Sequence, residues 1–176
     1  MRVIKEYGNV IVYLLRFIFL YLIFIQLYNL YLSFFKGDID PFTRITATAV
    51  RNIYRFFHLD SQVIPTQNEG IRLLINGKYV ARIVEGCNAI SLIILFAVFV
   101  LSFGKLKRGV IKFVLWGSVT IVLFNILRIA LLGYILYAFP QYQDFWHRIV
   151  FPATIYGWIV FLWIFFINKF MIKDVK

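Results

Sequence analysis

The sequence predicts an all-α membrane protein with four transmembrane helices, a small extracytoplasmic surface helix and a β-hairpin. Its 176 residues are 62% hydrophobic and only 15% charged, which is far too apolar for a soluble domain of this size. Apolar runs near the roughly 20 residues that cross a bilayer recur along the chain. An Asn76-Gly77 pair between two apolar stretches predicts the hairpin. We therefore expect a single membrane-embedded domain over residues 1–176, surrounded by the lipid bilayer.

The four spans are predicted from the longest apolar runs of the chain. They fall at about 10–35, 88–104, 111–135 and 150–168, and they leave an outer segment at about 36–86. The first span is more typical of an uncleaved signal anchor than of a signal peptide. Its apolar region is too long for a signal peptide, and no small-x-small cleavage site follows it.

The basic residues predict how the chain is oriented in the membrane. The net charge is +11, but the basic residues lie at the ends of apolar segments and form no single run, so nucleic acid is not an expected partner. Lys105-Leu106-Lys107-Arg108 contains no acid and is typical of a cytoplasmic loop. Further lysines follow the last span. We therefore expect both termini to be cytoplasmic, and the outer segment and the connection at 140–148 to be extracytoplasmic.

The outer segment has two predicted elements of its own. Asp40-Pro41 is typical of a helix N-cap and first turn, and arginines occupy a different helix face from the apolar residues that follow. The apolar positions are Phe42, Ile45, Ala49, Ile53 and Phe56, and the arginines are Arg44, Arg51 and Arg55. This pattern predicts a short helix on the outer membrane surface. The hairpin then pairs 71–75 with 78–84 and leads the chain to Cys87.

Cys87 is the only cysteine and lies at the outer start of the second predicted span. One cysteine excludes an intramolecular disulfide and a Cys-rich metal site, and we expect no metal and no cofactor. The positive end of a helix dipole favours the thiolate, which is the nucleophilic form. Glu85 would disfavour the thiolate unless its carboxylate orients Arg128, His147 or a substrate. A small apolar packing residue is the alternative interpretation of Cys87.

Arg128 lies about 15 residues into the third span, roughly 22 Å from its inner end and therefore in the outer leaflet. An arginine at such a depth costs about 2.5 kcal/mol or more unless it finds a partner or reaches the headgroups. Arginines of this kind usually face the bundle interior. Asn125 and Ser118 share its helix face, which predicts a polar inner stripe. The alternative is an arginine that extends to the outer headgroups.

His147 lies immediately outside the fourth predicted span, at the same membrane level as Cys87 and Arg128. Alone it is typical of an interface anchor. Together the three residues suit attack of sulfur on a peptide carbonyl. Arg128 would stabilise the developing oxyanion, with Asn125 or backbone amides near Asn88 as further donors. His147 would take the thiol proton and return it to the leaving amine.

These residues resemble a known family in their order and in their distances from the membrane edges. The segments that carry the resemblance are Val84-Glu85-Gly86-Cys87-Asn88-Ala89, Asn125-Ile126-Leu127-Arg128-Ile129 and His147. The chain resembles the exosortase and archaeosortase family, closest to the compact exosortase F type of Bacteroidetes. Two departures from the family pattern are visible. Larger members have about twice as many spans, and many have Cys-Ser-Gly or Cys-Ala-Gly where this chain has Cys87-Asn88-Ala89.

The resemblance implies a membrane-embedded cysteine protease or transpeptidase in the cytoplasmic membrane. It implies Cys87, Arg128 and His147 as catalytic residues. It also implies, as substrate, an exported membrane protein whose C-terminal sorting signal consists of a short motif, a transmembrane helix and a basic tail. Cleavage would occur at the outer membrane face, and the acyl enzyme would pass to water or to an unidentified amine acceptor.

Two other classes of function fit parts of the sequence. A non-enzymatic anchor or assembly subunit would use Arg128 to pair with an acidic residue on a partner helix. That class predicts that replacing Cys87 is harmless. A small transporter or channel fits poorly, because the sequence has no second intramembrane charge near the midplane and no inverted repeat.

Overall fold

The structure is a computed structural model that describes residues 2–66, 70–103 and 108–171. The helices are α1 (Arg2–Ser33), α2 (Pro41–Phe56), α3 (Ile90–Phe103), α4 (Arg108–Ala138), α5 (Gln143–Phe145) and α6 (Phe151–Phe166). The strands are β1 (Ser61–Thr66), β2 (Gly70–Ile75) and β3 (Lys78–Ile83). Short helical turns are η1 (Glu85–Cys87), η2 (Pro140–Tyr142), η3 (Trp146–Val150) and η4 (Ile167–Met171). Most of the predicted basic loop, at 105–107, and the last lysines lie outside the described residues.

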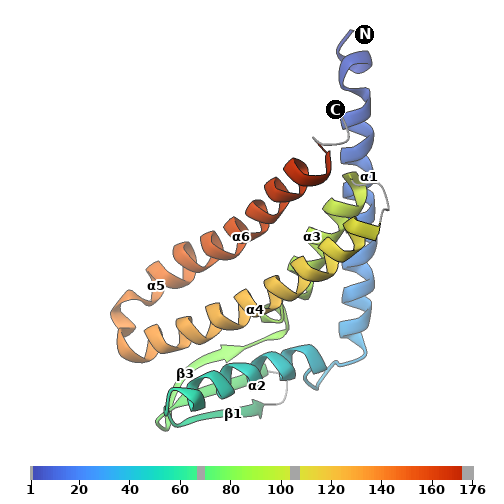
Figure 1. Cartoon of the computed structure of the whole chain (residues 1–176). Coiled ribbons are helices and arrows are strands. Elements are labelled where there is room, and N and C mark those ends of the chain that lie inside the picture. The colour runs from blue at the N-terminus through green and yellow to red at the C-terminus, as the bar shows by residue number, and fades with distance from the viewer. Residues whose placement is uncertain (1, 67–69, 104–107, 172–176) are drawn as a thin grey trace.

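The sheet and α2 lie together at one end of the molecule, next to α4 (Figure 1). The start of α1 and the end of α6 lie at one end, and α2 with the sheet lies at the other. Helix α3 packs along α1 through aromatic contacts, with the rings of Phe17 and Phe99 6.0 Å apart and those of Tyr13 and Phe103 5.6 Å apart. The turn η1 lies between β3 and α3, so the chain passes from the sheet into the helical bundle at η1.

Three helical stretches among the described residues are long and apolar enough to cross a membrane: Val10–Ser33, Arg108–Ala138 and Pro140–Phe170. Three of the four predicted spans are therefore supported. The remaining predicted span corresponds to α3, which is apolar but has only 14 residues. At 1.5 Å per residue it measures about 21 Å, which is shorter than the hydrocarbon core of a bilayer. The prediction of four spans is thus not confirmed.

The predicted connection at 140–148 is helical and continues into α6. Pro140 occupies the first turn of η2, a position where its missing N–H costs little. The chain then forms one π-helical turn, η3, directly before Pro152. A proline inside a helix offers no N–H and clashes with the carbonyl four residues earlier, and a π turn is one way for the helix to continue. His147 therefore belongs to a helix, not to a loop.

Helix α2 begins as predicted, but it packs through a different face. The Asp40 side chain accepts hydrogen bonds from the backbone N–H groups of Phe42 and Thr43, and Pro41 follows in the first turn. The buried positions are Thr43, Thr46, Ala47, Val50 and Tyr54. By contrast, Ile45 and Phe56 are exposed on the surface. The predicted apolar stripe is therefore largely on the exposed surface of α2, and Tyr54 together with smaller residues makes its contact with the core.

The sheet is antiparallel in the order β1-β2-β3. The predicted hairpin is present as β2 and β3. Asn76 and Gly77 have φ angles of 49° and 74°, the left-handed values that an Asn-Gly hairpin turn needs. Strand β1 was not predicted. It contains Pro65, which an edge strand tolerates because one row of its N–H groups has no partner strand.

Two hydrophobic clusters meet at the start of α3. The outer cluster joins α2, the sheet and α4, and it includes Tyr54, Leu73 and Ile129. The inner cluster joins α3, α4 and α6, and it includes Phe96 and Ile121. Asn125 lies on α4 one turn from each of Ile121 and Ile129, and it is 2% exposed. A buried polar position therefore separates the two clusters.

Candidate functional site

Cys87 ends the turn η1 that joins β3 to the helical bundle. Val84 extends the strand direction with φ −115° and ψ 170°, and the Cys87 N–H then donates to the Val84 carbonyl at 2.8 Å. Helix α3 begins at Ile90, so Cys87 lies before the first turn of α3 and not within it. The thiol is half-buried and packs against the outer cluster. The helix dipole therefore acts on Cys87 from a greater distance than the sequence predicts.

The Cys87 backbone is bonded to α4. The Asn125 side-chain amide donates a hydrogen bond of 2.7 Å to the Cys87 carbonyl oxygen, across 38 positions of sequence. Asn125 was predicted as a supporting donor toward a substrate oxyanion. In the structure its amide is instead occupied by the backbone of the candidate nucleophile.

Asn88 is buried at 4% exposure and joins α1 and α2 to the same junction. Its side-chain amide nitrogen lies 2.8 Å from the Tyr28 hydroxyl, 3.4 Å from Asp40 Oδ1 and 3.3 Å from Thr43 Oγ1. Its carbonyl oxygen accepts from the Tyr28 hydroxyl at 3.0 Å and from the Ile90 N–H at 3.1 Å. The Asn88 side chain thus caps the start of α3 and bonds to two other helices.

Arg128 lies on α4 three residues after Asn125, whose amide is hydrogen-bonded to the Cys87 carbonyl. Its guanidinium is within electrostatic range of the Cys87 thiol and of the Tyr156 hydroxyl on α6. The Arg128 Nε atom is buried and has no hydrogen-bond partner among the residues that the structure describes. A buried donor without a partner is rare in a folded protein and leaves a directed N–H available to a ligand. The structure therefore brings together Cys87 and Arg128, which the sequence placed at one level, and adds Tyr156, which the sequence analysis did not single out.

His147 lies apart from these groups. It is exposed in η3, and within the described residues no hydrogen bond or ion pair joins it to Cys87, Arg128 or Glu85. Its neighbour Arg148 pairs with Asp144 at 3.8 Å across one helical turn. A general acid or base must come within hydrogen-bond reach of the proton that it transfers. The third predicted member of the site would therefore need a substrate, a water molecule or a helix movement to reach the thiol.

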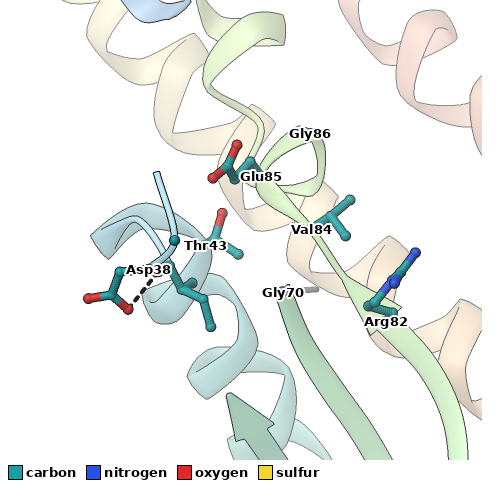
Figure 2. A pocket seen from close by; sticks show the side chains of 9 residues that line it. Asp38, Thr43, Gly70, Arg82, Val84, Glu85 and Gly86 are labelled. Carbon is teal, nitrogen blue, oxygen red and sulfur yellow. Dashed lines mark hydrogen bonds between the residues drawn. The ribbon is translucent and has the colours of Figure 1, made fainter. Parts of the chain in front are cut away.

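A cavity of about 430 Å³ lies beside the η1 turn (Figure 2). Thr43 and Asp38 lie on one side of it in this view, Gly70 and Arg82 on the other, and Glu85 lies at its rim. The Asp38 carboxylate accepts a hydrogen bond of 2.7 Å from the Ile39 N–H and forms an ion pair of 3.0 Å with Arg44. Within the described chain the Glu85 carboxylate has no ion pair with Arg128 or His147. It therefore faces a space next to Cys87 that a ligand could occupy.

Sequence reasoning missed three residues that bond to Asn88. Tyr28 is one of many aromatic residues in the first span, and Thr43 follows a helix N-cap without any distinguishing pattern. Asp40 was predicted only as the N-cap of α2. Its complete burial, at 0% exposure, was the feature that no local pattern indicated.

The family model for the transmembrane exosortase matches residues 6–168, which is nearly the whole chain and includes every residue of the candidate site. No curated protein and no solved structure matches the chain. Exosortases are a family of membrane proteases and transpeptidases. The match extends from α1 through α6, and it includes the junction at Cys87 and the polar positions of α4. The chain therefore belongs to the transmembrane exosortase family.

Proposed function

We propose that this protein is a membrane-embedded cysteine transpeptidase or protease that removes the C-terminal sorting signal of exported membrane proteins. The observation that supports it most is the environment of Arg128: its buried Nε has no hydrogen-bond partner among the described residues, and its guanidinium is within electrostatic range of the Cys87 thiol. A guanidinium so placed stabilises a thiolate before attack and an oxyanion afterwards. Family membership supports the same chemistry.

The proposed reaction uses one nucleophile in two steps. Cys87 Sγ, as the thiolate, adds to the scissile peptide carbonyl, and negative charge develops on its oxygen near Arg128. The C–N bond then breaks, the leaving amine takes a proton, and a thioester to Cys87 remains. Water or an acceptor amine attacks the thioester and regenerates the thiolate. His147 is the proposed proton donor and acceptor, since imidazole titrates near neutrality.

The proposed location is the cytoplasmic membrane, with Cys87 on the extracytoplasmic side. The start of α1 and the end of α6 lie at the end of the molecule opposite the sheet, as expected when both termini are on one side of the membrane (Figure 1). Arg108 and Lys112 at the start of α4 also favour the cytoplasm for that end. The transmembrane helix of the substrate would enter laterally, between helices.

The test is processing of a co-expressed membrane substrate that carries a tag on each side of its predicted cleavage site. We expect the wild-type protein to remove the C-terminal helix, and Cys87→Ala and Arg128→Ala to leave it attached. Arg16→Ala is the matched control, because Arg16 is an exposed arginine on α1, away from Cys87. Processing by Cys87→Ala at the wild-type rate would exclude the enzyme mechanism.

A non-enzymatic assembly role is the second candidate, and the unpartnered Arg128 Nε also favours it. An acidic residue on a partner helix would then complete the hydrogen bonding of Arg128. This role predicts that Cys87→Ala behaves as wild type while Arg128→Ala loses the partner in co-purification. The two variants together therefore separate the candidates.

A further inference from the structure

The hydrogen bonds of Asn88 form an interhelical clamp, which we define as Tyr28, Asp40, Thr43 and Asn88. An asparagine amide offers two donors and one acceptor oxygen with two lone pairs. Three acceptors lie within 3.4 Å of the Asn88 nitrogen, and two donors lie within 3.1 Å of its oxygen. The amide is thus fully satisfied, and its orientation is fixed from several directions.

The clamp includes a buried carboxylate that is only partly satisfied. Asp40 is 0% exposed. Its Oδ1 accepts hydrogen bonds from the backbone N–H groups of Phe42 and Thr43 and from the Asn88 side-chain amide. Its Oδ2 is buried, and no described residue forms a hydrogen bond with it. Burying a carboxylate in this way is costly. The cap of α2 explains why Oδ1 accepts hydrogen bonds from the backbone. It does not explain why the same oxygen also lies within hydrogen-bond distance of the Asn88 amide, 48 positions away in the sequence.

The clamp and Asn125 hold adjacent residues of one short segment. Asn125 bonds to the Cys87 carbonyl from α4, and the clamp bonds to the next side chain from α1 and α2. Ala89 follows with a φ angle of 65°, a left-handed value that costs an L-residue about 1–2 kcal/mol. Backbone strain of this size persists only where surrounding contacts fix it. Three helices therefore fix the backbone on the carbonyl side of the Cys87 Cα.

We propose that Asn88, held by Tyr28 and Asp40, is a positioning residue that orients the Cys87 thiol toward Arg128 for attack. The inference rests on the proposed function. Asn88 would act through the backbone of Cys87 without touching the substrate. Because a misplacement of about 1 Å at a reacting group can cost about 100-fold in rate, loss of the clamp affects turnover more than substrate binding.

The decisive variant is Asn88→Asp, assayed with purified full-length protein in detergent and the tagged substrate. It keeps the side-chain shape, removes the amide donors and sets a second carboxylate against Asp40. We expect kcat to fall about 10- to 100-fold while KM changes by less than about two-fold. Combining it with Asp40→Asn removes the charge repulsion across the pair and should raise kcat at least about three-fold above that of Asn88→Asp alone. Asparagine also caps helices well, so Asp40→Asn preserves the start of α2.

Two further variants keep the test decisive if Asn88→Asp folds poorly. Tyr28→Phe removes only one hydroxyl and should lower kcat about three- to ten-fold without changing KM. Asn52→Asp is the matched control, because Asn52 is exposed on α2, and it should retain wild-type kcat. Wild-type kcat in both Asn88→Asp and Tyr28→Phe, or no rescue by the double variant, would overturn the proposal. Full activity of Cys87→Ala would instead overturn the proposed function itself.

Discussion

The Asn125 side-chain amide donates a 2.7 Å hydrogen bond to the backbone carbonyl of Cys87. This bond joins α4 to the segment that carries the candidate nucleophile, at the level where the outer and inner hydrophobic clusters meet. Arg128 lies three residues further along α4, close to one helical turn. The same helix thus holds the Cys87 backbone and carries the arginine whose guanidinium is within electrostatic range of its thiol.

Asn125→Leu should destabilise the protein by about 1–3 kcal/mol, because it leaves the Cys87 carbonyl without its donor. Thermal unfolding in detergent measures this change, and Thr120→Val is the control. The Thr120 hydroxyl bonds only to the Gly117 carbonyl within α4, so its loss should cost less. Equal effects of the two substitutions would argue against a role for Asn125 in joining α4 to Cys87.

Ala89→Gly should stabilise the protein by about 0.5–1 kcal/mol. Ala89 has a φ angle of 65°, which glycine adopts without the steric penalty of a Cβ atom. The gain is reduced by the greater freedom of glycine in the unfolded chain. The same position is glycine in many members of the family that the sequence resembles. Ala47→Gly, inside α2, is the control and should destabilise by about 1 kcal/mol. A loss of stability in both variants would contradict the strained geometry at Ala89.

Gly117→Ala should separate α3 from α4 and cost about 1–3 kcal/mol. A Cβ atom at Gly117 would lie 2.4 Å from the Phe96 ring, which is itself completely buried. Gly157→Ala on α6 is the matched control, since among the described residues no atom outside its own stretch of helix lies within 4 Å of the position of its Cβ. Unfolding midpoints of the two variants should differ clearly, and partial recovery on adding Phe96→Leu would identify the contact. Identical midpoints would rule out the close α3–α4 approach.

Tyr54→Phe should reveal a pH-dependent contribution to stability. The Tyr54 hydroxyl donates a 2.6 Å bond to the Ala130 carbonyl, and burial raises its pKa above the usual value of 10. Below pH 10 the wild-type protein should therefore be more stable than the variant by about 1 kcal/mol. Above pH 10 the unfolded tyrosine ionises while the folded one stays neutral, so this advantage shrinks. A stability difference that stays constant or grows from pH 8 to 11 would contradict the burial of this hydroxyl.

Local sequence patterns predicted several elements because the physics that forms them is local. Asn76-Gly77 specifies its turn through two left-handed residues, and Asp40-Pro41 specifies a helix start through one side chain and one ring. The lengths of the apolar runs also predicted similar depths for Cys87 and Arg128, and in the structure Cys87 is hydrogen-bonded to α4 three residues before Arg128.

Other features depend on contacts between distant residues, and the sequence did not predict them. Asn88 meets Tyr28 across 60 positions and Asp40 across 48, and nothing in the neighbourhood of any of the three indicates the others. Strand β1 lacks the alternation typical of a strand and forms by pairing with β2. The helical segment that carries His147 was predicted as a connection, because its charged residues interrupt the apolar run.

The most direct measurement of the central claim is mass spectrometry of the purified protein, quenched with acid during turnover of the tagged substrate. The account predicts a mass increase equal to the N-terminal part of the substrate, carried on the peptide that contains Cys87 and released by hydroxylamine as expected for a thioester. Arg128→Ala should show little of this adduct, and Cys87→Ala none. Continued processing by Cys87→Ala, or an adduct on another residue, would contradict Cys87 as the nucleophile.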